Sequence, residues 1–423
     1  HAFIFLLHSF LQPTTKTSVS IFNFQQPFQH SLRHRVFNLC MEVSCLTYEL
    51  SELCLGKPPL KSISTSATVA EAIELLRSSG ESFVSVWNCD YSECVGKVCM
   101  VDVICYLCKE ESLLCPESAL KASIANVLNK VHGLVVHLEP SSSLLEAIDL
   151  ILEGAQNLVV PIVQTRRGGI SRRKQHQKSS TISGHNGVEF CWLTQEDVIR
   201  FLLGSIGLFA PLSAQSIADL DIISSDVLAI DYYSPAASVV EAIAKSLAQQ
   251  TSVAVVDGDG TFIGEISPFT LACCDESVAA AVTTLSAGDL MSYIDYGGPP
   301  EGLVSVVKAR LKEKNLEKLL QKFTILTSLT GDMSASSSSD EESPTRSLNS
   351  PGRYARSSSY STRFVRKAEA IVCHPKSSLI AVMIQAIAHR VNYLWVIDDD
   401  CSLIGIVTFS NILKVFREHT EMI

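Results

Sequence analysis

The stretch SLIAVMIQAIAHRVNYLWVIDDDCSLIGIVTFSNILKVF, residues Ser378–Phe416, decides the fold of this chain. Apolar residues at helical spacing come first, and a short apolar run follows at Leu394–Ile397. Three acidic residues then mark a turn before a second apolar run that carries Gly405. Periodicity of this kind predicts a helix, two strands joined as a hairpin, and a closing helix.

The same pattern occurs in three further stretches of the chain. Copy one is Thr68–Leu107, copy two is Ser143–Gly204 with an insertion, and copy three is Ser238–Cys274, so Ser378–Phe416 is copy four. An extended segment precedes the first helix of each copy, and the central runs are short enough for strands buried on both faces. The sequence therefore predicts four repeats of strand, helix, strand, strand, helix.

The first helix of each copy has a candidate N-cap residue. Thr68, Ser143, Ser238 and Ser378 stand at its start, and Glu follows three residues later in the first three copies. A hydroxyl at this position can accept a hydrogen bond from an otherwise unpaired backbone N–H. We expect all four residues to cap their helices.

Composition and charge limit the function classes. Apolar residues make up 47% of the 423 residues, and the formal net charge is -10. These values indicate globular cores and argue against a nucleic-acid binder. The longest uncharged candidate for a membrane span, residues 201–218, is interrupted by Gly, Pro, Ser and Gln, so no membrane span is predicted.

The 14 cysteines are scattered along the chain rather than arranged as a disulfide framework. This usage is typical of buried thiols in a reducing compartment. Cys105 and Cys108 form a CxxC within a helical pattern, and no second ligand pair accompanies them, so we predict packing rather than a metal site.

Residues 1–40 contain no Asp or Glu and precede Met41. We interpret them as translated untranslated-region sequence or, alternatively, as a transit-like peptide, and exclude them from the fold. The predicted location is cytoplasmic, or an organelle if residues 1–40 are a genuine transit peptide.

Two insertions interrupt the repeats. Residues 166–188 in copy two carry six Lys or Arg and no acid, which indicates a solvated loop or a docking surface for an anionic partner. Between copies three and four, residues 301–323 have a helical pattern, and the Ser-rich residues 333–365 are predicted to be disordered and open to phosphorylation.

A motif at the second hairpin strand carries the resemblance to a known family. It reads Gly-hydrophobic-x-Thr/Ser-x-x-Asp/Asn and leads into the closing helix. Copy four matches fully, and the other copies depart from the motif; the residues are Gly405, Ile406, Thr408 and Asn411 in copy four, Thr194 and Asp197 with Cys191 for Gly in copy two, Gly96 and Asp102 with Cys99 for the hydroxyl in copy one, and Gly264 and Ser267 with Thr270 at the acidic position in copy three.

The chain resembles the CBS-domain proteins, in particular the plant CBS-domain-only (CBSX-type) group, and more loosely the γ subunit of AMP-activated-type kinases. The resemblance implies an α/β (α+β) fold of four CBS repeats paired into two Bateman modules. It also implies clefts that bind an adenosyl ligand such as AMP, ATP or S-adenosylmethionine, with no required cofactor.

Carried over to this chain, the resemblance nominates Thr194 with Asp197 as the first ligand site. Thr408 with Asn411 comes next, and Asp102 is a weaker candidate. The acidic residue would hold a ribose diol, and the hydroxyl with the helix N-terminus would hold a phosphate. Helix capping is the alternative role for the same residues.

One departure weakens this assignment. The γ subunits place Arg or His just before the buried strand, where this chain has Phe83, Asn157, Ser252 and Tyr393. None of these four side chains can neutralise a phosphate.

The sequence contains no P-loop, nucleophile elbow or paired metal motif, so no catalytic and no metal-binding residue is predicted. We expect a non-enzymatic regulatory protein that senses an adenosyl ligand and modulates a protein partner, such as a kinase or a metabolic or redox enzyme, with a homodimer as an option. The alternative is a ligand-free scaffold or a γ-like kinase subunit. The predicted divisions are residues 41–125, 126–210, 211–284 and 366–423 for the four CBS copies, 285–332 for a helical insertion and 333–365 for the linker.

Overall fold

The computed structural model describes most of the chain between residues 47 and 421. The described ranges are 47–88, 93–128, 133–162, 188–295, 300–331 and 369–421. Residues 1–40, the Ser-rich residues 333–365 and all of the basic insertion except Val188 lie outside them. The predictions made for those segments therefore stay predictions.

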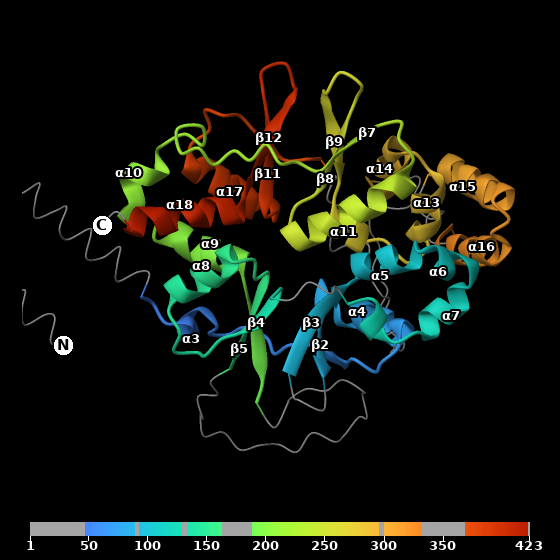
Figure 1. The fold of residues 1–423 in the computed structure, drawn as a ribbon, viewed down its shortest axis with the longest axis horizontal. Helices are drawn as coiled ribbons and strands as arrows, with labels where there is room; N and C mark the ends of the chain where they lie inside the picture. Colours follow the sequence, from blue (N-terminus) through green and yellow to red (C-terminus); the bar gives the residue numbers. More distant parts are fainter. Residues whose placement is uncertain are drawn as a thin grey trace, which may run out of the picture.

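Each copy forms the predicted strand, helix, strand, strand, helix unit, which confirms the fold class (Figure 1). Copy one comprises β1 (Ser62–Ser64), α4 (Val69–Ser79), β2 (Phe83–Asn88), β3 (Glu93–Cys99) and α5 (Met100–Leu107). Copy two comprises β4 (Val135–His137), α8 (Leu144–Leu152), β5 (Asn157–Pro161), β6 (Phe190–Thr194) and α9 (Gln195–Gly204).

The second half of the chain repeats the unit. Copy three comprises β7 (Ala229–Asp231), α11 (Val240–Gln249), β8 (Val253–Val256), β9 (Phe262–Ile266) and α12 (Pro268–Ala272). Copy four comprises β10 (Val372–Cys373), α17 (Leu379–His389), β11 (Tyr393–Ile397), β12 (Leu403–Thr408) and α18 (Phe409–Glu421). In each copy the middle strand pairs in parallel with the first and antiparallel with the third.

Three of the four predicted N-caps are confirmed. The hydroxyls of Thr68, Ser143 and Ser378 each accept a hydrogen bond from the backbone N–H three residues on. The prediction for Ser238 is wrong, because a 3-10 turn at Ala236–Val239 runs directly into α11. Ser238 instead donates its hydroxyl to the carbonyl of Pro235 at 2.6 Å.

The copies pack sheet against sheet in two pairs. Trp87 and Cys94 of copy one meet Val159 of copy two in a small buried cluster. Tyr393 and Trp395 of copy four meet copy three in the equivalent cluster. Figure 1 shows the pair of copies one and two in the lower half of the molecule and the pair of copies three and four in the upper half.

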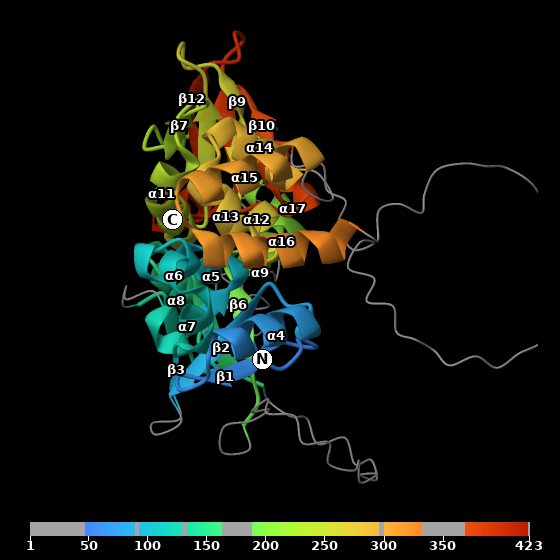
Figure 2. The ribbon, with the colours of Figure 1, turned by 90° about the vertical axis from the view of Figure 1, so that its right-hand side faces the viewer.

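Helices join the two pairs through two larger cores. The helices of copy one share a core with those of copy three, and those of copy two share a core with those of copy four. Figures 1 and 2 show these helices between the sheets of the two halves. Arg417 of α18 and Asp149 of α8 form an ion pair of 2.5 Å across one of these boundaries.

Short helices complete the described structure: α3 (Leu50–Leu53), α6 (Glu110–Leu114), α7 (Pro116–Lys121), α10 (Ala210–Ser213), α13 (Val278–Thr284), α14 (Ala287–Asp295), α15 (Glu301–Glu313) and α16 (Glu317–Gly331). The predicted helical pattern at residues 301–323 forms α15 and the start of α16, with Val307 and Phe323 buried against the core of copies one and three. None of the helices in the described ranges is long and apolar enough to cross a membrane.

The segment before each copy's first strand, which we call its leader, lies against the other member of the pair. Each leader forms a single β-bridge to the start of the partner copy's first helix. The bridges are Glu49 with Ser143, Ser123 with Thr68, Ser216 with Ser378, and Ser286 with Pro235. The leaders are thus exchanged reciprocally within each pair.

The exchanged leaders cover the Gly position of the motif. At two of these glycines the fifth residue after the bridge lies there: a Cβ on Gly96 would stand 3.0 Å from Leu128, and one on Gly264 would stand 2.7 Å from the sulfur of Met291. At Gly405 the nearest atom is the backbone carbonyl of Ser224, which cannot rotate away. These glycines therefore allow the leader to approach the strand closely.

We predict that Gly405→Ala lowers the free energy of unfolding by about 1–3 kcal/mol, because the new methyl group overlaps the Ser224 carbonyl. Gly302→Ala in α15 is the matched control, since no atom lies within 4 Å of its Cβ position and alanine favours a helix. Chemical denaturation of both variants measures the difference. Equal stability of the two variants would show that the leader does not constrain this strand.

Candidate functional site

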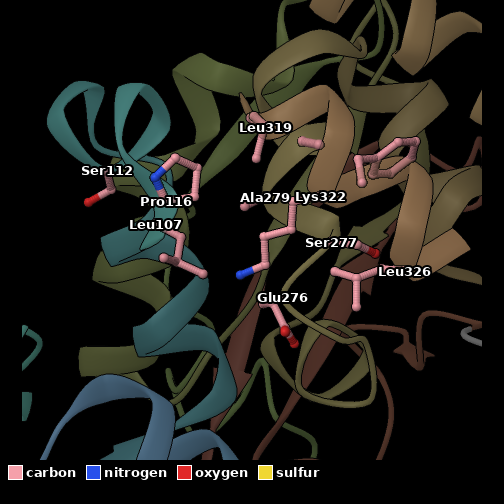
Figure 3. Close-up of a pocket in the computed structure, with 11 residues that line it drawn as sticks. Leu107, Ser112, Pro116, Glu276, Ser277, Ala279, Leu319, Lys322 and Leu326 are labelled. Atoms are coloured by element: carbon pink, nitrogen blue, oxygen red, sulfur yellow. The ribbon is translucent and has the colours of Figure 1, made fainter. Parts of the chain in front are cut away.

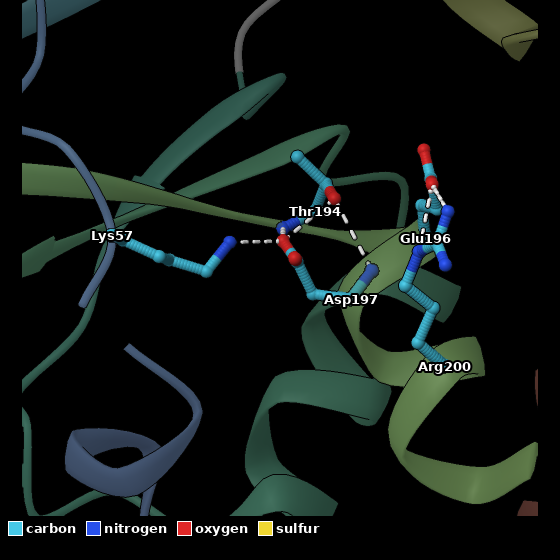
Figure 4. A network of polar contacts seen from close by, with 5 residues as sticks. All are labelled: Lys57, Thr194, Glu196, Asp197 and Arg200. Atoms are coloured by element: carbon cyan, nitrogen blue, oxygen red, sulfur yellow. Dashed lines mark hydrogen bonds and ion pairs between the residues drawn. The ribbon is translucent and has the colours of Figure 1, made fainter. Parts of the chain in front are cut away.

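Thr194 and Asp197 form a capping box at the start of α9. The Thr194 hydroxyl accepts from the N–H of Asp197 at 3.3 Å, and Asp197 Oδ2 accepts from the N–H and the hydroxyl of Thr194 at 2.8 and 2.7 Å. A third donor also reaches this carboxylate: Lys57 Nζ lies 2.6 Å from the same oxygen (Figure 4). The predicted site residues therefore come together, and the exchanged leader of copy one adds a cation to them.

Thr408 and Asn411 form the same arrangement at the start of α18. Asn411 Oδ1 accepts from the N–H and the hydroxyl of Thr408 at 2.9 and 2.7 Å, and the Thr408 hydroxyl accepts from the N–H of Asn411 at 3.2 Å. Asn411 is neutral, and no ion pair involves it among the residues that the structure describes. Among the described residues, this site has no lysine bound as Lys57 is bound to Asp197.

The weaker motifs of copies one and three also serve as caps. Asp102 accepts from the N–H of Cys99 at 2.8 Å, and burial raises the pKa of this carboxyl. Ser267 accepts from the N–H of Phe269 at 3.2 Å. In every copy the motif thus organises the start of the closing helix, and its role toward a ligand stays a prediction.

A second cation lies at the interface between copies one and two. Lys97 of β3 donates to Asn157 of β5, and its Nζ lies 4.9 Å from the centre of the Phe83 ring. Asn157 stands opposite Thr194 in the sheet register, so Lys97 reaches the same end of the interface as the capping box. Burial lowers the pKa of Lys97 to about 8.

The interface between copies three and four carries an acid at the equivalent position. Glu265 follows Gly264 as Lys97 follows Gly96. Its Oε2 accepts from the hydroxyl of Tyr393 at 2.9 Å and from the indole N–H of Trp395 at 2.7 Å, and the side chain is buried.

A second acid strengthens the negative charge of this interface. Burial and then the charge of Glu265 raise the pKa of Asp295 to about 6. Tyr393 corresponds to Asn157 in register, because it stands opposite Thr408 as Asn157 stands opposite Thr194. The two interfaces thus share a geometry, with a lysine in one and a carboxyl group in the other at the equivalent position.

The sequence reasoning missed Lys57, Lys97 and Glu265. It sought cations only before the buried strand, where Phe83, Asn157, Ser252 and Tyr393 stand. The signal that could have found two of them is the residue after the motif Gly, which is Lys in copy one and Glu in copy three. No comparable sequence signal marks Lys57, because it reaches Asp197 through the leader of copy one, which lies against copy two.

A pocket also opens away from both interfaces, between the helices of copy one and the insertion helices (Figure 3). Leu107 and Pro116 line one side, and Lys322 and Leu326 of α16 line the other. Burial lowers the pKa of Lys322. None of the predicted site residues lines this pocket.

Known proteins share this organisation. Residues 364–418 match the CBS domain family. The CBS domain-containing protein CBSX5 of Arabidopsis thaliana is 52% identical over 400 residues, which cover 90% of this chain and 99% of that protein. The chain belongs to the CBS domain-containing proteins. The predicted resemblance to the plant CBSX-type group is thereby confirmed.

More distant proteins are also similar to the chain. CBSX6 of Arabidopsis thaliana is 28% identical, with coverage of 87% of this chain and 93% of that protein. The SNF1-related protein kinase regulatory subunit gamma-like PV42b of the same organism is 22% identical, with coverage of 76% and 75%. Protein MJ1225 of Methanocaldococcus jannaschii shares the fold, with a TM-score of 0.50, 14% identity and coverage of 87% of this chain and 100% of that one.

We predict that Asp295→Asn stabilises the protein at pH 7 and that this gain disappears as the pH falls. The folded-state pKa of about 6 lies above the ordinary aspartate value of 3.8, so the ionised carboxylate destabilises the fold above pH 6 and the cost is lost as protonation proceeds toward pH 4. Because the side chain is only half-buried, we expect a gain of roughly 0.5–1 kcal/mol. Unfolding curves at pH 4 and pH 7 test this, and an equal gain at both would contradict the burial of charge at this site.

Proposed function

We propose that this CBS-domain protein is a non-catalytic regulator that binds an adenosyl nucleotide between copies one and two. Binding there would alter its contact with a protein partner. The observation that carries the proposal is the pair of lysines, Lys57 and Lys97, beside the Thr194 and Asp197 capping box. Its similarity to a gamma-like kinase regulatory subunit supports the regulatory role.

The phosphate of such a ligand has suitable partners in this cleft. The start of α9 carries the positive end of a helix dipole, and the Thr194 hydroxyl lies beside it. Lys97 is partly desolvated, so its attraction for an anion is stronger than that of an exposed lysine. A phosphate could also draw Lys57 from Asp197 and leave that carboxylate to a ribose diol.

The remaining surface of the cleft suits an adenine ring. Phe83 and Trp192 meet edge to face, with ring centres 5.5 Å apart, directly below Lys97. Aromatic faces of this kind stack with nucleobases. The contacts of Asp197 within the described residues use Oδ2, so Oδ1 is available to accept from a ribose hydroxyl.

A scaffold role is the second candidate, and it applies to copies three and four. Glu265 is satisfied by Tyr393 and Trp395, so the cleft is filled by a hydrogen-bonded acid that repels phosphate. We therefore assign nucleotide sensing to one pair and partner contact to the other. The nature of the partner, the cytoplasmic location and a homodimer stay predictions.

We predict that Lys97→Met weakens AMP binding by about tenfold or more, because a charge-assisted hydrogen bond to phosphate contributes about 1.5–3 kcal/mol. Isothermal titration calorimetry of the full chain measures the affinity. Lys245→Met is the matched control, since Lys245 is an exposed lysine of α11 that pairs with Glu241 one turn away. AMP affinity that is unchanged in Lys97→Met would overturn the assignment of Lys97, and no AMP binding to the wild type would overturn the proposed function.

The pKa of Lys97 gives the binding a pH dependence. A group with a pKa of about 8 is charged at pH 7 and largely neutral at pH 9.5, so the affinity for AMP should fall across this range. Lys97→Arg should flatten the profile, because a guanidinium stays charged. Titrations at pH 7 and pH 9.5 compare the two proteins, and an equal loss of affinity in both would exclude Lys97 as the titrating group.

A further inference from the structure

Cys191 departs from the repeat in a way that the ligand site does not explain. It stands at the motif position that is Gly in the other three copies. At Gly96 and Gly264, that position faces the fifth residue after the bridge of the exchanged leader, which is Leu128 or Met291. In the leader of copy one the bridge residue is Glu49, and the fifth residue after it is Cys54.

By the spacing found at Gly96 and Gly264, but not at Gly405, the two cysteines stand at the closest approach of leader and strand. Both side chains are buried in the core of copies two and four, with Cys54 5% exposed and Cys191 fully buried. Two contacts flank them: the N–H of Leu60 donates to the carbonyl of Phe190 at 2.8 Å, and Lys57 pairs with Asp197.

The two thiols also affect each other's titration. Cys191 lowers the pKa of Cys54, and Cys54 raises the pKa of Cys191. Burial and the charge of Asp197 oppose the lowering at Cys54, the charge of Lys57 adds to it, and the pKa of Cys54 ends below its usual value. Cys54 is thus the sulfur that more readily becomes a thiolate, and Cys191 is the donor beside it. A thiolate is the form that reacts with peroxides and with other sulfur atoms.

We propose that Cys54 and Cys191 form an oxidisable dithiol whose disulfide fixes the leader of copy one to β6. The two cysteines are 137 positions apart in the sequence, so the cross-link would close a long loop and restrict the unfolded chain strongly. The reduced, dithiol form is the one in the structure.

Hydrogen peroxide supplies the two oxidising equivalents. The Cys54 thiolate attacks one peroxide oxygen, the O–O bond breaks, and Cys54 becomes a sulfenic acid while the departing hydroxide takes a proton to form water. Cys191 then attacks the Cys54 sulfur, the S–S bond forms, the S–O bond breaks, and a second water leaves with the Cys191 proton. Two thiols and one peroxide thus give one disulfide and two waters.

The cross-link would act on the cleft of copies one and two. Lys57 lies three residues after Cys54, and Thr194 lies three residues after Cys191. Fixing the leader would hold Lys57 on Asp197 and keep it from a phosphate. This effect on a nucleotide rests on the proposed function, whereas formation of the disulfide does not.

Oxidation of the full chain tests the proposal. Reduced protein is treated with an equimolar amount of hydrogen peroxide, alkylated, digested and analysed by mass spectrometry, and its melting temperature is measured. We expect a cross-linked peptide pair that contains Cys54 and Cys191, and a melting temperature raised by several degrees that dithiothreitol reverses.

The controls use residues that the chain itself places at equivalent positions. Cys191→Gly and Cys54→Met copy the residues of other repeats, so they should fold and should lose both the cross-link and the shift. Cys373→Ala removes a buried thiol of β10 in the other pair and should lose neither.

Wild-type protein that forms no Cys54–Cys191 cross-link with peroxide would overturn the proposal. A melting-temperature shift that survives in Cys191→Gly would also overturn it. A cross-link that forms normally and leaves AMP affinity unchanged would instead overturn the proposed action on the nucleotide site.

Discussion

The reciprocal exchange of leaders is the packing constraint on which the structure depends. Each leader bridges to the first helix of the other copy in its pair and then lies against that copy's second hairpin strand. Close approach of this kind requires a small residue on the strand, and Gly96, Gly264 and Gly405 provide it. Each copy of a pair is therefore covered in part by the leader of the other copy. Any cleft between them contains side chains from both copies and from a leader.

This arrangement explains how similar copies can have different properties. In each pair, the residue that follows the motif Gly in one copy contacts a residue of the other copy. That second residue is the strand partner of the motif Thr in its own copy. In one pair this contact joins Lys97 to Asn157, and in the other it joins Glu265 to Tyr393. The residue at this repeated position thus differs between the pairs, with lysine in one and glutamate in the other. Because buried charges interact strongly in a low dielectric, we propose that this difference determines which ligands each interface accepts.

Local features of this chain could be predicted from sequence, and contacts between copies could not. The repeat predicted the order of elements, and short-range hydrogen bonding predicted the caps at Thr68, Ser143 and Ser378. Ser238 failed because Pro235 begins a 3-10 turn that the repeat does not specify. Lys57 reaches Asp197 across 140 positions, through a leader exchanged between copies. Periodicity records which face of a strand is buried, but it does not record which distant segment covers that face.

The central claim is that the two pairs are chemically unequal and that only copies one and two accept an anionic nucleotide. The number of AMP molecules bound per chain at saturation, measured by equilibrium dialysis of the reduced full chain, tests it most directly. Our account predicts one AMP per chain, competed away by inorganic phosphate at high concentration. Two AMP molecules per chain would contradict it, because the cleft that holds Glu265 would then also accept a phosphate.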